Sequence, residues 1–125
     1  MKPLNKTELQ IMKCLWNADC FLKDIVEAYP EPKPAYTTIS TLVRRMVKKG
    51  YIGFEKIGRD KRYFSLLNKK TYFSTQLKSM VADFFNNSSA QFASFFTDNS
   101  EMDLEELKEL QDFVQEKINQ KQKEC

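Results

Sequence analysis

Hydroxyl and cationic side chains recur between positions 35 and 52 with a spacing suited to nucleic-acid contact. The segment reads AYTTISTLVRRMVKKGYI. At about 100° per residue, a helix would gather its threonines and cations on one side. These residues are Thr37, Thr41, Arg44 and Lys48 in a stripe, with Arg45 and Lys49 beside it. Short hydroxyls followed by cations suit a helix whose first turns enter a major groove and whose end lies along phosphates. An ordinary solvated helix face is the alternative interpretation.

The opposite side of the same segment is apolar. Five aliphatic residues follow the i, i+3, i+4, i+7, i+8 spacing of a helix face directed at a core. They are Ile39, Leu42, Val43, Met46 and Val47. Gly50 follows as the expected residue just beyond the helix C-terminus.

Two shorter helices are expected before this one. Asn5 and Glu8 have the spacing of a capping box that opens a first helix running to about Trp16. Its inward residues would be Leu9, Met12, Leu15 and Trp16. A second helix should run from position 22 or 23 to Tyr29, where the first of three spaced prolines follows and ends it. Three helices with a tight turn before the third form a helix-turn-helix.

A β-hairpin is expected after the third helix. Strand-like segments at 51–57 and 61–67 flank a turn formed by Gly58, Arg59 and Asp60. Three cations lie at or beside this turn: Arg59, Lys61 and Arg62. A basic-tipped hairpin after a helix-turn-helix indicates a winged helix, although solvation alone could explain these charges.

Apolar residues recur at helical spacing beyond Asn68. Three helices are expected: one to about Phe85, a short phenylalanine-rich one after the break at 86–89, and a last one capped by Asp103. The apolar residues expected to form a shared surface are Phe73, Leu77, Met80, Phe84, Phe92, Phe96, Leu104, Leu107, Leu110, Val114 and Ile118.

The need to cover that apolar surface favours a homodimer. Burying one Phe or Leu contributes about 1.5–3 kcal/mol, so an exposed row would be costly. A second copy of the chain would bury it, whereas packing on the N-terminal domain as a monomeric cap is the alternative. The predicted fold is mainly α with a small β-hairpin wing. It comprises a winged helix-turn-helix domain at 1–68 and a three-helix dimerisation domain at 69–125.

The charge distribution separates the same two parts. Residues 1–67 carry 13 Lys/Arg and 7 Asp/Glu, a net charge of +6, whereas residues 68–125 carry 7 and 10, a net charge of −3. A basic N-terminal part is typical of polyanion binding. No run approaches the roughly 18 apolar residues of a membrane span, and no apolar signal segment is evident near the start. We therefore expect a cytoplasmic chain without membrane insertion.

The residue types argue against metal and catalytic chemistry. Histidine is absent, and Cys14, Cys20 and Cys125 show no CxxC spacing. The usual zinc sites are therefore not expected, and the thiols should remain reduced in the cytoplasm. No histidine base, glycine-rich phosphate loop or distinct carboxylate pair suggests an enzyme, and no cofactor is expected. Cys14 should pack as a small hydrophobic residue.

Several segments together resemble the BlaI/MecI/CopY penicillinase-repressor family. They are LNKTELQIMKCLW, the AYTT start of the third helix, VRRMVKKGYI and the GRDKRYFSL hairpin. The resemblance is strong to about Leu67 and rests on pattern afterwards. It implies a winged-helix repressor with a helical dimerisation domain. By position, it implies DNA contacts from Thr37, Thr38, Thr41, Arg45 and the wing around Arg59–Arg62.

Combining resemblance and periodicity divides the expected contacts into two classes. The three threonines Thr37, Thr38 and Thr41 are expected at base edges, since a threonine can hydrogen-bond a base or touch a thymine methyl. Phosphate contacts are expected chiefly from Arg44, Arg45, Lys48 and Arg62.

The chain departs from the family in features linked to induction. Copper-responsive members carry several cysteines near the C-terminus, whereas only Cys125 stands there in this sequence. Members linked to antibiotic resistance are released when a protease cuts an Asn-Phe bond. This chain contains no Asn-Phe pair, and Ser94–Phe95 occupies the corresponding place. Cleavage there by a membrane metalloprotease sensor is a hypothesis.

The sequence therefore favours a transcriptional repressor that binds a double-stranded DNA operator with an inverted repeat as a homodimer. The alternative is a winged-helix adaptor that binds protein and not DNA. The clustered cations of the third helix argue against the adaptor.

Overall fold

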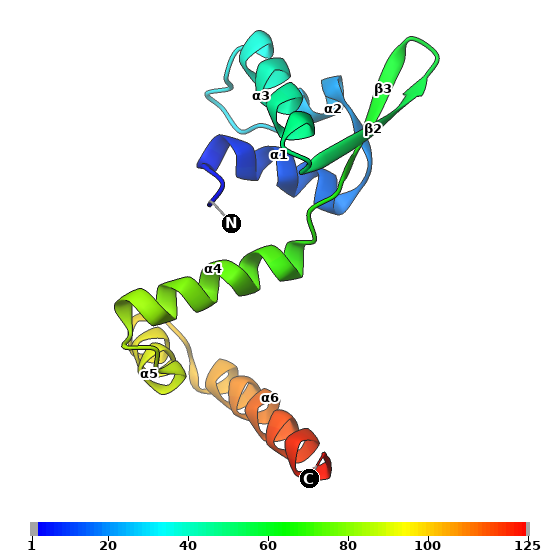
Figure 1. Ribbon diagram of the computed structural model, residues 1–125. Helices are drawn as coiled ribbons and strands as arrows, with labels where there is room; N and C mark the ends of the chain where they lie inside the picture. Colours follow the sequence, from blue (N-terminus) through cyan, green and yellow to red (C-terminus); the bar gives the residue numbers. More distant parts are fainter. Residues whose placement is uncertain (1–2, 125) are drawn as a thin grey trace. The chain divides into compact units, whose positions relative to one another are not determined.

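The computed structural model describes residues 3–124, which form six helices and a small sheet (Figure 1). In chain order these are α1 (Lys6–Asn17), β1 (Cys20–Phe21), α2 (Leu22–Glu27), α3 (Tyr36–Lys48), β2 (Ile52–Ile57), β3 (Asp60–Ser65), α4 (Lys69–Phe84), α5 (Ser89–Asn99) and α6 (Leu104–Lys123). They divide into two compact units, one ending at Leu77 and the other beginning at Lys78, so the division falls within α4. The mainly α fold with a winged helix and a helical C-terminal region is confirmed.

The predicted capping box opens α1. The Asn5 side chain accepts a hydrogen bond from the Glu8 amide at 2.8 Å, and the Glu8 carboxylate accepts one from the Asn5 amide at 3.0 Å. These bonds satisfy two backbone donors that the first turn leaves unpaired. The helix continues to Asn17, one residue beyond the predicted end.

Helix α2 is shorter than predicted and ends at Glu27 instead of Tyr29. The amide of Tyr29 bonds to the Val26 carbonyl at 3.3 Å, which tightens the last turn. The Tyr29 ring is buried, and its hydroxyl donates to the Thr7 carbonyl on α1 at 2.7 Å. A tertiary contact therefore takes Tyr29 out of the helix before Pro30 would have ended it.

The hairpin is part of a three-stranded antiparallel sheet with the order β1-β3-β2. The pairing of Ile57 with Asp60 leaves a two-residue turn, so the prediction that Asp60 lies in the turn was wrong. Gly58 has φ +65, and a positive φ at the first of two turn residues is the pattern of a II′ hairpin. Strand β1 was not predicted because two residues show no alternating pattern.

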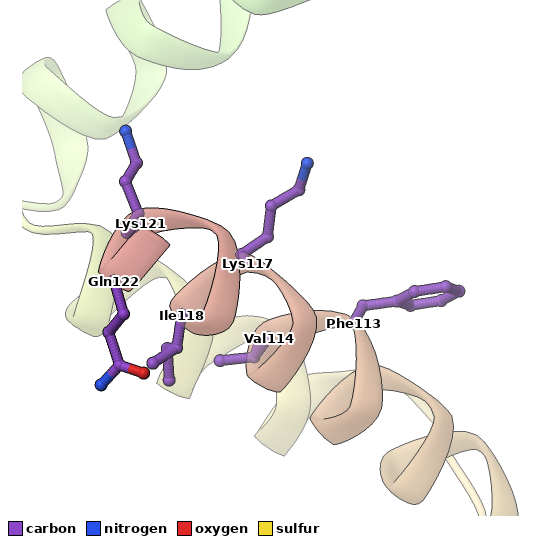
Figure 2. Close-up of a pocket in the computed structure, with 6 residues that line it drawn as sticks. All are labelled: Phe113, Val114, Lys117, Ile118, Lys121 and Gln122. Atoms are coloured by element: carbon purple, nitrogen blue, oxygen red, sulfur yellow. The ribbon is translucent and has the colours of Figure 1, made fainter. Parts of the chain in front are cut away.

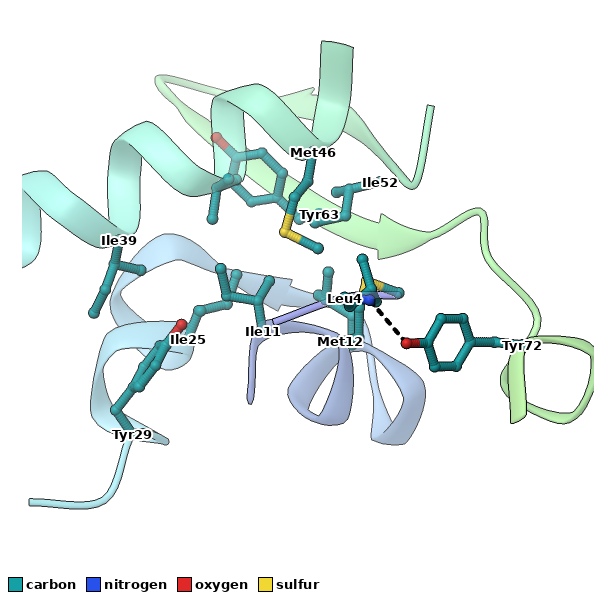
Figure 3. Packing of buried hydrophobic residues seen from close by; sticks show 12 residues of the cluster. Leu4, Ile11, Met12, Ile25, Tyr29, Ile39, Met46, Ile52, Tyr63 and Tyr72 are labelled. Carbon is teal, nitrogen blue, oxygen red and sulfur yellow. Dashed lines mark hydrogen bonds between the residues drawn. The ribbon is translucent and has the colours of Figure 1, made fainter. Parts of the chain in front are cut away.

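The core of the first unit draws buried residues from each of its helices and from β2 and β3 (Figure 3). Its buried hydrophobic residues are Leu4, Ile11, Met12, Leu15, Ile25, Tyr29, Ile39, Val43, Met46, Ile52, Tyr63 and Tyr72. Three of the five aliphatic residues predicted on the inner face of α3 are fully buried, and Leu42 and Val47 pack partly buried against them. That burial fixes α3 to the domain and sets which side faces outward.

The start of α4 packs on this core. The Tyr72 hydroxyl accepts a hydrogen bond from the Leu4 amide at 2.9 Å (Figure 3). The indole of Trp16 donates to the Leu67 carbonyl at 2.7 Å. The Trp16 ring also lies 5.6 Å from that of Phe73, centroid to centroid. Trp16 thus serves packing, as its spacing indicated.

The second unit contains the end of α4, α5 and α6. The Phe85 ring contacts those of Phe92 and Phe95 at 5.5 and 5.3 Å between centroids. Asp103 caps α6 as predicted, accepting a hydrogen bond from the Glu106 amide at 2.8 Å. Among the described residues, no helix has the length and apolar character needed to cross a membrane.

Candidate nucleic-acid interface

The outer side of α3 presents every polar residue that the sequence assigned to it. The fully buried Ile39, Val43 and Met46 anchor the inner side. The exposed residues are Thr37, Thr38, Thr41, Arg44, Arg45 and Lys48. A surface of hydroxyls and cations is thus held on a rigid helix.

Four of these side chains share one shallow hollow. Thr37, Thr38, Thr41 and Arg45 line it together with the edge of Leu42. Three of these five are the threonines expected at base edges. The hollow therefore brings hydrogen-bonding groups, methyl groups and one guanidinium to a single place on the helix.

The Thr41 hydroxyl has a defined orientation. It donates to the Thr37 carbonyl at 2.8 Å. Its proton is therefore engaged within the helix, while its oxygen retains acceptor capacity. In this rotamer Thr41 can accept a hydrogen bond from a base amino group or offer its methyl to thymine.

The cations at the end of α3 differ in their surroundings. Lys49 lies 3.9 Å from the buried Glu8 carboxylate, nitrogen to oxygen. Burial raises the pKa of the Tyr63 hydroxyl, and the positive charge of Arg44 opposes that shift, which places Arg44 near β3. The Arg45 side chain makes no hydrogen bond or ion pair with another residue in the part of the chain that the structure describes. The Arg45 guanidinium is thus available to an external anion.

The wing cations are not equivalent. Arg59 stands in the turn and is exposed. The Lys61 ammonium lies 4.6 Å from the centroid of the Phe54 ring, a cation–π contact that holds it on one face of the hairpin. Arg62 pairs across the strands with Glu55 and is only half-exposed. A phosphate contact from Arg62 would therefore compete with Glu55.

Further residues near the wing were not identified from the sequence. Lys56 pairs in register with Lys61 and is exposed, so the two share one face of the hairpin. A hollow between α3 and the wing is lined by Lys23, Tyr36, Arg59 and Lys61, among others. The alternation of the hairpin would have indicated Lys56, whereas Lys23 and Tyr36 come together only through the tertiary fold.

The geometry of a helix-turn-helix with an adjoining basic wing agrees with comparison to known proteins. The profile of a family described as "Penicillinase repressor" matches residues 4–116. The chain belongs to the penicillinase-repressor family. A relative named "Penicillinase repressor" from Bacillus licheniformis is 27% identical over 124 residues, covering 94% of each chain. The resemblance drawn from the sequence is confirmed.

Family membership sets the broad functional class. Members of the penicillinase-repressor family are DNA-binding regulators of transcription and not enzymes. The exposed outer side of α3 is therefore the candidate DNA interface of this repressor. No cluster of three or more His, Cys, Asp or Glu residues with the arrangement of a metal site occurs within residues 3–124. Cys125 lies outside the described residues.

The residues expected at a dimer surface are distributed between the two units. Phe73 contacts the Trp16 and Tyr72 rings and remains partly exposed, and Leu77 ends the first unit. The second unit holds the remaining nine: Met80, Phe84, Phe92, Phe96, Leu104, Leu107, Leu110, Val114 and Ile118. Only Phe92 and Leu110 of these nine are half-buried, and the others are exposed.

An apolar hollow runs along the C-terminal half of α6 (Figure 2). Phe113, Val114 and Ile118 line it with the stems of Lys117 and Lys121 and with Gln122. Figure 2 shows Val114 and Ile118 extending on the same side of the helix. Phe113 and Val114 are 57% and 56% exposed, far more than core residues allow.

The Ser94–Phe95 bond lies within α5, and both residues are exposed. The Ser94 carbonyl accepts from the Thr97 hydroxyl at 3.1 Å, and the Phe95 carbonyl accepts from the Asn99 side-chain amide (Nδ2) at 2.9 Å. The bond is accessible at the surface but is held in helical geometry.

Proposed function

We propose that this repressor binds an inverted-repeat DNA operator as a homodimer. Each protomer places α3 in a major groove and its wing on the adjoining backbone. The observation that carries this proposal is the outer side of α3, where threonines and cations are exposed on a helix anchored by its buried apolar face. Occupation of the operator then blocks transcription of the adjoining genes.

The two classes of side chain contribute different energies. Thr37, Thr38 and Thr41 read base edges, each contact discriminating by about 1–3 kcal/mol. Arg44, Arg45 and Lys48 neutralise phosphates, with Arg59 and Lys61 from the wing. Phosphate neutralisation releases counterions, so affinity falls steeply as salt rises.

The exposed apolar residues of α6 support dimerisation through the second unit. Leu104 is 68% exposed, and Phe113 and Val114 are more than half exposed. A matching surface on a second copy would remove them from water at about 25 cal/mol per Å². Dimerisation doubles the DNA contacts and sets two recognition helices about one helical turn apart.

Proteolysis in the second unit is the proposed release step. A membrane metalloprotease sensor would cut Ser94–Phe95, separating α6 from the DNA-binding unit. Exposure of both residues supports access, although the helix must first unwind locally. Incubation with sensor-containing membranes should yield two fragments as the promoter becomes active. Promoter induction with an intact chain would exclude this step.

Fluorescence anisotropy tests the proposed function directly. The labelled duplex carries the inverted repeat from the promoter region next to the gene, and a scrambled duplex of equal length is the control. We expect tighter binding to the repeat and measurable binding to both duplexes at low salt. An adaptor that binds protein would show little affinity for either duplex, and that result would overturn the proposal.

A further inference from the structure

Two cysteines of the DNA-binding unit lie in contact with each other. Cys14 belongs to the last turns of α1, and Cys20 begins β1. Their sulfur atoms are 3.1 Å apart, and both residues are free thiols that are half-buried. The sequence spacing alone does not predict this contact, because two side chains six residues apart can point in many different directions.

The turn between α1 and β1 holds the two thiols together. The Ala18 amide donates to the Cys14 carbonyl at 3.2 Å and ends the helix. The Cys20 thiol lies 3.2 Å from the Ala18 carbonyl, to which it donates. Cys20 is also paired with Tyr63 of β3. Hydrogen bonds to the backbone on both sides of the pair thus hold the two sulfur atoms close together.

We propose that Cys14 and Cys20 are a site of reversible oxidation that forms an intramolecular disulfide. A disulfide bond is about 2.05 Å long, so the sulfur atoms must approach by about 1 Å, a movement that small side-chain rotations supply. This site is separate from the DNA-binding surface and goes beyond the proposed repressor function.

The oxidant is a peroxide, and the chemistry balances in two steps. A thiolate attacks one peroxide oxygen, the O–O bond breaks, and the products are a sulfenic acid and water once a proton is taken up. The second thiol then attacks the sulfenic sulfur, forming the S–S bond and releasing a second water. In total, two thiols are oxidised and one hydrogen peroxide is reduced to two waters.

The environment of the pair determines the order of the two steps. Burial, and then the neighbouring Cys20, raise the pKa of the Cys14 thiol to about 12. Cys14 therefore stays protonated at neutral pH and acts second, on a sulfenic acid formed at Cys20. Contact between the sulfurs lets the second step outpace further oxidation of Cys20.

The disulfide would join α1 covalently to the sheet. Strand β1 pairs with β3 through Cys20–Tyr63 and Phe21–Arg62, and β3 is one strand of the wing. Closing the short loop from 14 to 20 restricts the unfolded chain. The oxidised DNA-binding unit should therefore unfold at a higher temperature than the reduced one.

The experiment uses the full chain carrying Cys125→Ser, so that the third thiol cannot form links between molecules. The protein is treated with hydrogen peroxide, alkylated under denaturing conditions and digested with trypsin. Both cysteines lie in the expected peptide 14–23, between Lys13 and Lys23. We expect this peptide to be unalkylated and lighter by two hydrogen atoms, and dithiothreitol should restore full alkylation.

Thermal unfolding gives a second, independent measure. The oxidised protein should melt roughly 10 °C above the reduced protein. Cys14→Ser and Cys20→Ser in the same background should each lose the shift and remain folded when reduced. Full alkylation of both cysteines after peroxide treatment, or oxidation to separate sulfinic acids, would overturn the proposal. An unchanged melting temperature after proven bond formation would overturn the proposed stabilisation.

Discussion

Replacing Arg45 with Ala should flatten the salt dependence of DNA binding. Arg45 is exposed on α3, and its side chain makes no hydrogen bond or ion pair with other residues among positions 3–124. Its removal should therefore leave the fold intact, since alanine also favours helix. What the substitution removes is a cation available to a phosphate.

The size of the effect follows from the number of phosphates that the variant no longer neutralises. Each neutralised phosphate contributes about 0.9 to the slope of log K against log salt. A dimer presents Arg45 twice, so the slope should decrease in magnitude by about 1.8. The affinity advantage of the unmodified protein over Arg45→Ala should then shrink about 12-fold between 50 and 200 mM salt.

The assay is an anisotropy titration on operator and scrambled duplexes at five or more salt concentrations. Lys13→Ala is the matched control, because it removes one exposed positive charge from α1, away from the candidate surface. It should leave the slope unchanged. An Arg45→Ala slope equal to that of the unmodified protein, with circular dichroism showing a folded chain, would refute the assignment of Arg45 to phosphate.

Three further substitutions test base reading, dimerisation and the titration of a buried tyrosine. Thr38→Ala should reduce discrimination between operator and scrambled DNA by about 1–3 kcal/mol, measured as the ratio of the two dissociation constants. Ile118→Glu should convert the dimer to a monomer in sedimentation velocity, because a charge would be buried in the proposed contact of α6 with a second copy. Burial raises the pKa of Tyr29 from 10.0 to about 12, so the unfolded chain loses this proton at lower pH than the folded one. The resulting stability is complete below pH 10 and falls as pH rises toward 12. The free energy of unfolding of Tyr29→Phe, measured in urea, should therefore decrease less over that pH range than that of the unmodified protein.

Each of these three tests has its own control. Thr75→Ala removes a hydroxyl from α4 and should leave discrimination intact, and equal weakening on both duplexes by Thr38→Ala would place base reading elsewhere. Gln120→Glu adds a charge about 200° around α6 from Ile118, so it should not dissociate the dimer. A Tyr29→Phe protein that loses stability above pH 10 as steeply as its parent would show that other groups determine the loss.

Local patterns were sufficient to predict the elements that carry function. The capping box of Asn5 and Glu8 predicts the start of α1, and the apolar spacing of α3 predicts which side is buried. Knowing the inner side defines the outer one, which is why the exposed threonines and cations could be named from the sequence.

Features that depend on long-range contacts could not be predicted in this way. Strand β1 exists because β3 lies beside it, and Tyr29 leaves α2 because α1 offers a carbonyl. The pairing of Arg62 with Glu55 depends on the strand register. That register is set by the two-residue turn, which is one residue shorter than the predicted turn. Contact between the two thiols likewise requires the turn at Ala18.

Amide hydrogen exchange with and without operator DNA tests directly whether α3 is the DNA-recognition helix. We expect DNA to slow exchange in α3, chiefly at 37–48, and in the wing at 56–62. Peptides from α6 should show equal exchange in both states if the dimer exists before binding. Slowed exchange confined to 78–124, or none at all under conditions where DNA is bound, would contradict the assignment of α3 to DNA recognition.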